Sequence, residues 1–488
     1  MIMTETNQAL QGIRPLIEQQ MKLWNVPGLA VAVIKDQEVI MAEGFGYRDV
    51  EAGLEVTPET LFAIGSTTKA FTAVAAGILV DEGKIDLDVP VKNYLPHFKM
   101  YDSLATERVT LRDMLCHRTG LPRHELMHYN SSFSREEVIE RLQYLEPNQD
   151  FRSGWQYQNI MYMVAGYIVG QRLGTTWEQV VQEKILNPLQ MNVSNFSVED
   201  SQKQPNYALP YIDNGDQLQR IPFRNIDLIG PAGSINSNIM NMAKWVMVLL
   251  DKGVQQGQRI VSESSLAEVF KPHMPTDSWI TKETPMCCYG LGWCIEPYRG
   301  HQVLHHGGGI DGFTAEVAFS PDENLGVVIL ANKNGSPLPL ILRHNLFDRL
   351  LGLDEIDWSG RIRGTGKENE TENQDETHQP EEEAKEQEIT KEAETLPTHQ
   401  MHEYTGTYEH PGYGELVIDM IDDHLQVTFN SIQLPLARLN NHAFELDYKP
   451  FQYKTPATFY TDANDHIVRV GIKMLIEPGT KDIEFVKK

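Results

Sequence analysis

The 488-residue sequence is poor in cysteine. Its four cysteines are too few and too irregularly placed for a disulfide framework, and they lack the paired CxxC spacing of a zinc site. Cys116 falls in a helical pattern, where a small buried thiol is the simplest interpretation. We therefore expect no metal site and no cofactor held by thiolates, and none is suggested elsewhere in the chain.

Long apolar runs are also missing. The two longest, residues 70–80 and 161–170, fall well short of the roughly 20 residues that a membrane-spanning helix needs. Residues 1–8 show no positive charge followed by an apolar run, so they do not resemble a secretory signal. These absences predict a soluble, cytoplasmic protein without a membrane partner.

The chain has fewer basic than acidic residues. The chain has 42 basic and 68 acidic residues, a net charge of −26, which argues against nucleic acid and anionic membranes because both require a basic face. Residues 367–394 hold 12 acids and three lysines, with almost no large apolar side chains. Such a segment cannot bury a core, and a solvated linker is a better interpretation than a docking segment. We therefore predict three parts, a first domain at 9–355, an acidic linker at 360–400 and a second domain at 401–488.

The first domain combines strand and helix patterns. Residues 28–49 and 316–335 each read as an antiparallel hairpin, with turns at 35–38 and 321–324. Strands at both ends with helices between them predict an α+β fold, in which helices cover both sides of an antiparallel sheet built from distant parts of the chain. The helical patterns between the hairpins each close on a glycine, and they end at Gly83, Gly120, Gly174 and Gly253.

The last part of the chain reads differently. From Tyr404 to Lys488, short alternating apolar runs recur about every ten residues and are separated by turn residues. This is the pattern of a small antiparallel β-barrel or sandwich.

Ser66 and Lys69 are the first candidates for chemistry. They lie one helical turn apart, which places the lysine amine within reach of the serine hydroxyl. A serine needs a neighbouring base to become a nucleophile, and the apolar stretch after Lys69 would supply the desolvation that lowers an amine pKa. Ser-x-x-Lys alone is weak evidence, because a chain of this length contains about two by chance.

Tyr157 and Asn159 form a second candidate motif, just before an apolar helical run. A phenol near an ammonium ionises more easily, so Tyr157 is a candidate second proton carrier. The Asn159 amide can bind both Lys69 and a substrate carbonyl, although packing and helix capping are the simpler roles for these two residue types.

The stretch "VLHHGGGIDGF" is the third candidate. Its glycines allow a substrate backbone to approach closely, and an unobstructed N–H group can point at a developing oxyanion. His306 would donate a hydrogen bond to the substrate or to Tyr157. Metal binding by His305 and His306 is disfavoured, because adjacent strand residues face opposite sides.

Together the three motifs resemble those of the serine β-lactamase and penicillin-binding-protein superfamily, in particular its class C-like hydrolases and peptidases. The resemblance covers roughly residues 12–351, and "LRDMLCHRTGLPRHE" also looks like the family. The motifs stand in the family's order as Ser66-Thr67-Thr68-Lys69, Tyr157-Gln158-Asn159 and His306-Gly307-Gly308.

The resemblance implies a role for each motif residue. Ser66 would be the acylated nucleophile, Lys69 and Tyr157 would share the role of base, and Asn159 would orient Lys69 and the substrate. The backbone N–H groups of Ser66 and Gly309 would form the oxyanion hole. The remaining motif residues, His306, Gly307 and Gly308, would line the substrate.

The third motif also bears on the substrate. Penicillin-active members carry lysine where this chain has His306, the variant of esterases and D-aminopeptidases, and a neutral imidazole anchors a carboxylate less firmly. We therefore predict a serine hydrolase that works through an acyl-enzyme on small esters or short peptides and amides. Two alternatives stay open, a penicillin-binding acyl trap or sensor with slow deacylation and a non-catalytic assembly protein. The C-terminal part resembles a lipocalin-like domain that shapes access to the site or a homo-oligomer.

Overall fold

The computed structural model describes the chain except for residues 1–8, 216, 277–279, 365–398, 441 and 449–452. The chain forms two compact units. Unit 1 consists of residues 1–97, 107–120 and 150–362, and unit 2 consists of residues 98–106, 121–149 and 363–488. Most of the predicted acidic linker lies outside the described residues, so the predicted domain boundaries stay a prediction.

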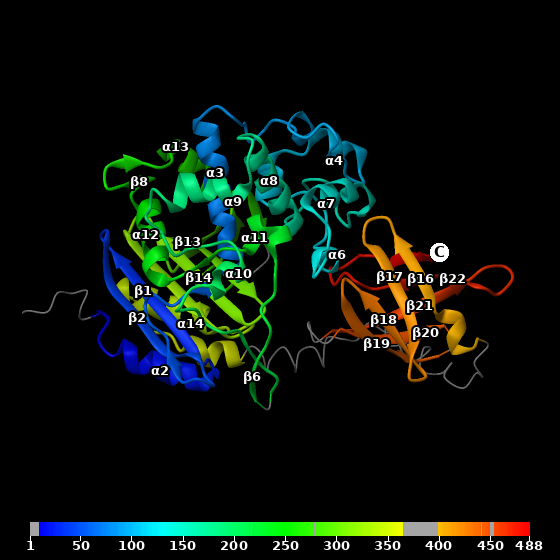
Figure 1. Ribbon diagram of the computed structural model, residues 1–488. Helices are drawn as coiled ribbons and strands as arrows, with labels where there is room; N and C mark the ends of the chain where they lie inside the picture. The colour runs from blue at the N-terminus through cyan, green and yellow to red at the C-terminus, as the bar shows by residue number, and fades with distance from the viewer. Residues whose placement is uncertain (1–8, 216, 277–279, 365–398, 441, 449–452) are drawn as a thin grey trace, which may run out of the picture. The chain divides into compact units, whose positions relative to one another are not determined.

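Unit 1 is built on a nine-stranded antiparallel sheet (Figure 1). The N-terminal hairpin pairs with a strand from residues 325–331, so the sheet joins distant parts of the chain as the sequence predicts. In spatial order its strands are β10 (Met274–Thr276), β11 (Cys287–Tyr289), β12 (Cys294–Tyr298), β13 (His301–Ile310), β14 (Phe313–Ser320), β15 (Leu325–Ala331), β1 (Gly28–Lys35), β2 (Glu38–Asp49) and β3 (Leu54–Glu55).

Helices cover both faces of this sheet. Figure 1 shows α2 (Ile13–Leu23) and α14 (Leu338–Leu350) on one side and α12 (Ile239–Leu250) on the other. The central strands β1 and β15 are therefore buried on both faces, which explains their near-continuous apolar sequences. Alternate residues of these two strands pack into one core with α2 and α14.

Figure 1 shows further helices of unit 1 on the α12 side of the sheet, among them α3 (Thr68–Asp81) and α8 (Asn159–Gln171), which are buried almost all round. Their sequences are correspondingly apolar on every face. These helices and the short turn before α3 are η1 (Gly65–Thr67), α3 (Thr68–Asp81), α5 (Leu111–Leu115), α8 (Asn159–Gln171), α9 (Trp177–Val181), α10 (Val198–Gln202), α11 (Gly230–Gly233) and α13 (Glu263–Val269).

The predicted helix that ends at Gly120 is shorter than expected. Thr110 and Asp113 form a capping box that starts α5, but the helix stops at Leu115 and Cys116 is its buried C-cap. His117 then adopts a left-handed conformation with φ of 60°, which ends the helix and redirects the chain. Gly120 also has positive φ.

Unit 2 contains a closed barrel of eight antiparallel strands, in agreement with the sequence prediction. Buried residues alternate with more exposed ones along β18 and the first half of β17, and the buried side chains of the barrel include several aromatic ones. Its strands are β16 (Gly406–His410), β17 (Gly414–Ile421), β18 (His424–Phe429), β19 (Ile432–Arg438), β20 (Ala443–Tyr448), β21 (Tyr453–Thr461), β22 (Ile467–Ile472) and β23 (Ile483–Lys487).

A segment from the middle of the chain completes unit 2. Residues 121–149 carry α6 (Glu125–His128) and α7 (Arg135–Arg141). Leu126 of α6 lines an apolar cavity of about 10 Å³ together with barrel residues such as Phe429. The Tyr413 hydroxyl lies 2.7 Å from His124 Nδ1. Both contacts join the barrel to a segment that lies almost 300 residues earlier in the sequence.

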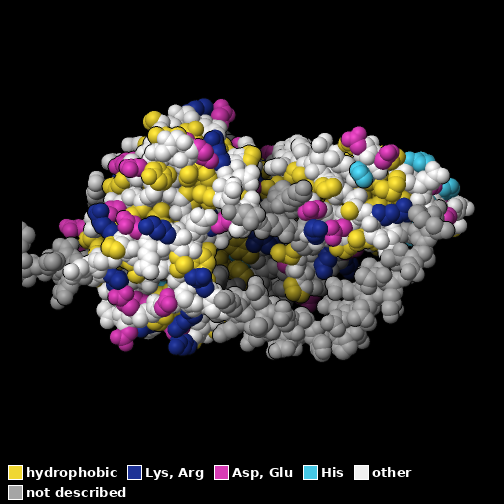
Figure 2. Space-filling view, turned by 90° about the horizontal axis from the view of Figure 1, so that it is seen from below, with side chains coloured by type: hydrophobic (Ala, Val, Ile, Leu, Met, Phe, Trp, Pro, Cys, Tyr) yellow, Lys and Arg dark blue, Asp and Glu magenta, His cyan; other side chains and the backbone are white. Residues whose placement is uncertain are grey.

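On the face drawn in Figure 2, basic side chains lie among acidic ones. Several exposed pairs are ion pairs, for example Lys454–Glu445 at 2.7 Å and Arg469–Glu484 at 3.1 Å. Such pairs contribute little to stability. None of the helices within the described residues is both long enough and apolar enough to cross a bilayer.

Candidate active site

Ser66 lies in the short turn η1 at the start of the buried helix α3. Its side chain is partly exposed, and the Lys69 Nζ atom lies 3.1 Å from the Ser66 Oγ atom, as the helical spacing predicts. A hydroxyl at the end of a buried helix with an amine beside it is the arrangement in which a serine can be deprotonated.

The buried Lys69 amine also donates hydrogen bonds to atoms outside the Ser66 turn. Nζ donates to Asn159 Oδ1 at 2.7 Å and to the Ala232 carbonyl at 2.9 Å. The amine also lies 4.6 Å from the centroid of the Tyr157 ring, a cation–π distance. A fully buried ammonium is costly when it is unpaired, and these contacts offset that cost.

Tyr157 and Asn159 lie at the start of α8. Asn159 is the first residue of the helix, and the Gln158 side chain provides the N-cap by accepting a hydrogen bond from the Ile160 N–H. Gln158 thus caps the helix, and Asn159 Oδ1 accepts a hydrogen bond from Lys69. The structure therefore favours the Lys69-binding role of Asn159 over the capping role.

His117 contacts the segment that carries Tyr157 and Gln158. Its ring centroid lies 4.4 Å from that of Tyr157, and its Nδ1 atom accepts a hydrogen bond from the Gln158 N–H at 3.0 Å. The backbone of the same residue accepts from Gln156 at 2.8 Å. His117 was not predicted as a site residue, because no motif marks it.

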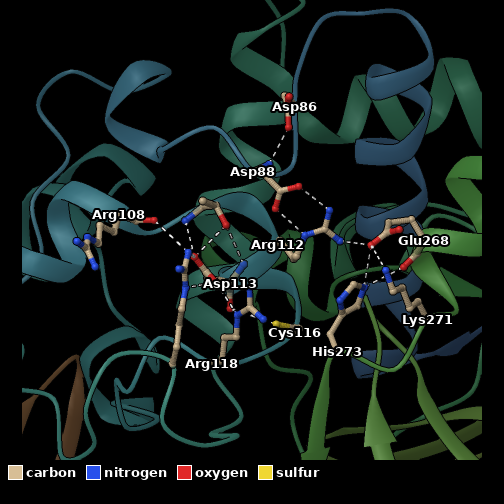
Figure 3. A network of polar contacts seen from close by, with 12 residues as sticks. Asp86, Asp88, Arg108, Arg112, Asp113, Cys116, Arg118, Glu268, Lys271 and His273 are labelled. Carbon is tan, nitrogen blue, oxygen red and sulfur yellow. Dashed lines mark hydrogen bonds and ion pairs between the residues drawn. The ribbon is translucent and has the colours of Figure 1, made fainter.

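Asp113 ties the two loops beside this motif together (Figure 3). Its buried carboxylate accepts hydrogen bonds from Arg118 at 2.5 Å and from Arg152 at 2.7 and 2.9 Å. Burial opposes the charged form, but the bonds from the two arginines outweigh it and lower the pKa of Asp113. The Arg152 N–H also donates to the Arg118 carbonyl at 2.9 Å, so residues 117–120 and 152–158 are held side by side.

Of the two partners expected for His306, the substrate and Tyr157, the second is not the one that its ring nitrogens contact. Its Nε2 atom lies 2.8 Å from the hydroxyl of Tyr289, and its Nδ1 atom lies 2.6 Å from the Gly307 carbonyl oxygen. The ring centroids of His306 and Tyr157 are 6.2 Å apart. Both ring nitrogens are thus engaged by Tyr289 and the backbone, and not by Tyr157.

The three consecutive glycines at 307–309 have different surroundings, and a Cβ atom on Gly307 would lie 3.3 Å from Glu316 Oε2. A Cβ atom on Gly308 would lie 2.0 Å from the Ile64 carbonyl oxygen, so this glycine lets β13 pack against the turn that carries Ser66. On Gly309 a Cβ would meet nothing within 4 Å. The expected close approach of a substrate therefore fits Gly309, whereas Gly308 serves packing within the protein.

The Gly309 N–H group lies beside the Ser66 turn. Gly65, with φ of 52°, is so close to β13 that a Cβ there would lie 2.8 Å from the Gly309 nitrogen. The predicted oxyanion pair, the N–H groups of Ser66 and Gly309, thus belongs to two backbone segments that are in contact.

Comparison with known proteins gives the family. The sequence profile of the Beta-lactamase family matches residues 13–349. The chain belongs to the Beta-lactamase family. A second profile, for a domain of unknown function called DUF3471, matches residues 390–487 and includes the barrel strands.

Within this family the chain is similar to proteins that are named hydrolases. It is 30% identical over 457 residues to the unguisins hydrolase ungD of Aspergillus violaceofuscus, and the matched region covers 86% of this chain and 79% of the relative. It is 29% identical over 425 residues to the unguisins hydrolase ungD' of Aspergillus campestris, which spans 84% and 77%. Protein flp of Staphylococcus aureus strain MW2 is 26% identical over 349 residues, 70% of this chain and 66% of the relative.

The fold is that of the β-lactamases and transpeptidases, followed by the closed barrel. An octameric penicillin-binding protein homologue from Pyrococcus abyssi matches 97% of this chain and 99% of its own chain, with a TM-score of 0.62 and 24% identity. A likeness at this identity shows the fold and does not identify the reaction.

Proposed function

We propose that the protein is a serine hydrolase that acts through an acyl-enzyme formed on Ser66. The Ser66 Oγ attacks a substrate carbonyl carbon while its proton passes to Lys69. The tetrahedral oxyanion is stabilised by the N–H groups of Ser66 and Gly309. Its collapse breaks the bond to the leaving group, which takes a proton, and a water molecule then hydrolyses the acyl-serine.

The observation that carries this proposal is the set of atoms around the Lys69 amine. Two of its neighbours, Asn159 Oδ1 and the Ala232 carbonyl oxygen, can only accept hydrogen bonds, whereas the Ser66 hydroxyl can also donate one. A neutral amine has two N–H groups and one lone pair. When the two N–H groups are used on the two carbonyl oxygens, the lone pair faces the Ser66 proton.

Tyr157 is proposed as the second proton carrier, because its ring lies against the Lys69 amine. A proton moved from Ser66 to Lys69 is then close to a second group that can deliver it to the leaving group. The expected substrates are small esters and short peptides or amides, and two relatives that are named unguisins hydrolases support hydrolase activity in general. A cytoplasmic location and a homo-oligomer stay predictions, the second of which light scattering tests.

Labelling of the purified protein with a fluorophosphonate, followed by intact-mass measurement, tests the nucleophile. We expect one adduct on Ser66, none in S66A, and normal labelling in the control S264A, whose serine is exposed on α13. Labelling of S66A at the wild-type rate would contradict the proposal.

The same measurement with an aryl ester or a fluorescent penicillin separates the three functions. A transient adduct with burst kinetics supports the hydrolase. A persistent adduct supports the acyl trap, and the absence of any Ser66 adduct across esters, amides and penicillin supports the assembly role.

A further inference from the structure

The hydrogen bonds of His306 fix its protonation form. A carbonyl oxygen only accepts, so the 2.6 Å contact between Nδ1 and the Gly307 oxygen requires a proton on Nδ1. In a neutral imidazole the other nitrogen, Nε2, is then an acceptor, and its partner at 2.8 Å is the hydroxyl of Tyr289, which can donate. The Gly307 carbonyl sets this tautomer, because the Tyr289 hydroxyl can donate or accept and also has the Tyr162 side chain as a hydrogen-bond partner.

The surroundings of His306 favour the neutral ring. The side chain is buried, and this burial lowers the pKa of His306 to about 3. The acids of this part of the sheet pair instead with the preceding residue, since His305 lies 3.3 Å from Glu296 and 3.3 Å from Glu316. Adjacent strand residues face opposite sides, so these carboxylates act on His305.

Tyr289 is held firmly where it meets His306. It is buried on β11, and its ring packs against those of His117 and Trp155, with centroids 4.8 and 5.9 Å away. Strand β12 begins at Cys294, which pairs with His305, so His306 lies beyond the end of β12. The Tyr289 side chain reaches His306 at this point of the sheet.

The other cations described around the site are already engaged. Lys69 is bound to Ser66, Asn159 and Ala232, as set out above. Arg224 lies 3.3 Å from Asp311, in a small cavity that continues past the end of β13. A substrate carboxylate beside the third motif would therefore lie near an imidazole whose Nε2 is already hydrogen-bonded and near Asp311, the acidic partner of Arg224. Too few favourable interactions would then offset the free-energy cost of removing that carboxylate from water.

We propose that Tyr289 is a positioning residue that sets the charge preference of the site. By capping Nε2 it keeps His306 a neutral ring with no donor to offer, and the site selects substrates whose group beside the third motif is uncharged. That group is then an ester, an amide or a blocked peptide end, and not a free carboxylate. The proposal rests on the acyl-enzyme function and adds the substrate class.

Two matched pairs of substrates test the charge preference of the wild-type protein. One pair is 3-carboxyphenyl acetate and 3-carbamoylphenyl acetate, and the other is a short peptide with a free C-terminal carboxylate and the same peptide as its C-terminal amide. We expect kcat/KM to be at least about tenfold higher for the uncharged member of a pair that is turned over. Equal values, or a preference for the carboxylates, would overturn the proposal.

Variants connect the preference to Tyr289. In Y289F the His306 Nε2 loses its donor, and we expect the uncharged-to-charged ratio to fall several-fold, while H306K, which introduces an ammonium, shifts it further in the same direction. The control Y298F removes another buried hydroxyl, which is bound 2.6 Å from Asp348 away from this site, and is expected to keep the wild-type ratio. A Y289F ratio equal to that of the wild type contradicts the proposal.

A spectroscopic measurement keeps the test independent of turnover. The ¹⁵N chemical shifts of the His306 ring should report a proton on Nδ1 and a hydrogen-bonded, unprotonated Nε2, and the Nε2 signal should move in Y289F and stay in Y298F. A protonated Nε2 in the wild type would overturn the proposal. If S66A hydrolyses both aryl esters as fast as the wild type, the acyl-enzyme function fails, and the ring signals still decide the state of His306.

Discussion

Lys69 is the residue on which the proposed chemistry depends most, because its buried amine lies within hydrogen-bond distance of the Ser66 hydroxyl, Asn159 Oδ1 and the Ala232 carbonyl oxygen. We predict that K69A lowers the rate of Ser66 acylation by about 10²–10⁴-fold, the usual contribution of a general base. Stopped-flow measurement of fluorophosphonate or ester acylation checks this. An acylation rate within a few-fold of wild type in a variant with a normal melting curve would remove Lys69 from the base role.

The glycines of the third motif give a second test at this scale, because two neighbours have opposite surroundings. In G308A the new Cβ would meet the Ile64 carbonyl, and we predict a loss of about 1–3 kcal/mol in the free energy of unfolding, as in other overpacked sites. In G309A the Cβ enters open space, so we expect wild-type stability and a reduced kcat/KM. Denaturant unfolding and ester kinetics on both variants distinguish packing from substrate contact, and equal stability losses would show that the two positions do not differ.

For single residues, the sequence predicts the reactive side chains more completely than it predicts the residues that contact them. Ser66 and Lys69 are found because a helix fixes their spacing. The sequence does not predict the contact of Tyr289 with His306. That contact depends on the pairing of β11 with β12 and of β12 with β13, which no local sequence pattern determines. The contact of Lys69 with the Ala232 carbonyl is not predicted either, because every residue type has a backbone carbonyl oxygen and the sequence does not mark this one.

At the scale of elements, strand β13 separates two different environments, because His306 faces the site and His305 belongs to a buried ion network. Burial and the Arg343 charge oppose protonation of His305, but Glu296 and Glu316 outweigh them and raise its pKa to about 9. Arg343 of α14 lies 3.1 Å from Glu296 and 3.2 Å from Glu316. The network therefore attaches α14 to the strand that carries the third motif.

This raised pKa predicts how stability depends on pH. The folded state binds the His305 proton more tightly than the unfolded chain, whose histidines titrate near 6.5. The stabilisation from His305 is complete below about pH 6.5 and is lost as the pH rises through about 9. We expect the melting temperature to fall over this range and the fall to be smaller in H305Q, as measured by calorimetry. An identical pH dependence in H305Q would contradict this.

The Asp113 network gives a further prediction for the loops on either side of the second motif. D113A leaves Arg118 and Arg152 without their carboxylate and removes the Asp113 side-chain half of the α5 capping box, and we predict a loss of about 3–5 kcal/mol in the free energy of unfolding. The matched control is D88A, because Asp88 also binds an arginine, Arg112, but is exposed. Its loss should stay within about 1 kcal/mol.

Urea unfolding of the two variants compares the buried and the exposed pair directly. A D113A variant as stable as D88A would show that the buried carboxylate does not hold the loops.

Element by element, the sequence predicts what local periodicity determines. The hairpins of β1–β2 and β14–β15 and the buried helices α3 and α8 lie where the patterns place them. Helix α5 is shorter than its pattern, because His117 leaves the helix to pack against Tyr157 and to accept from Gln158. A tertiary contact outweighs helix propensity there.

At the scale of the whole molecule, the division into compact units does not follow the order of the chain. Residues 121–149 belong to unit 2, although the Beta-lactamase profile covers them. The sequence alone does not predict that residues 121–149 belong to unit 2, because their local pattern contains no information about packing against a barrel that begins almost 300 residues later. Composition and alternation do predict the barrel itself.

Leu126 provides the test at this scale. It is buried in unit 2 among barrel residues that include Phe429 and Leu446, and we predict that L126A lowers the stability of this unit by about 2–5 kcal/mol. Hydrogen exchange read separately on the two units checks this, with faster exchange expected in barrel strands β17 and β18. The control is L104A, in an exposed leucine, which should leave the exchange of these strands unchanged. Unchanged barrel exchange in L126A would show that the segment is not needed by the barrel.

The interleaving of segments in unit 2 has an evolutionary consequence. A deletion that removed the barrel alone would take away the residues that cover Leu126 and the hydroxyl that contacts His124. Descendants that lack the barrel should therefore show polar replacements, or a deletion, in residues 121–149. The two regions of the gene are expected to change together.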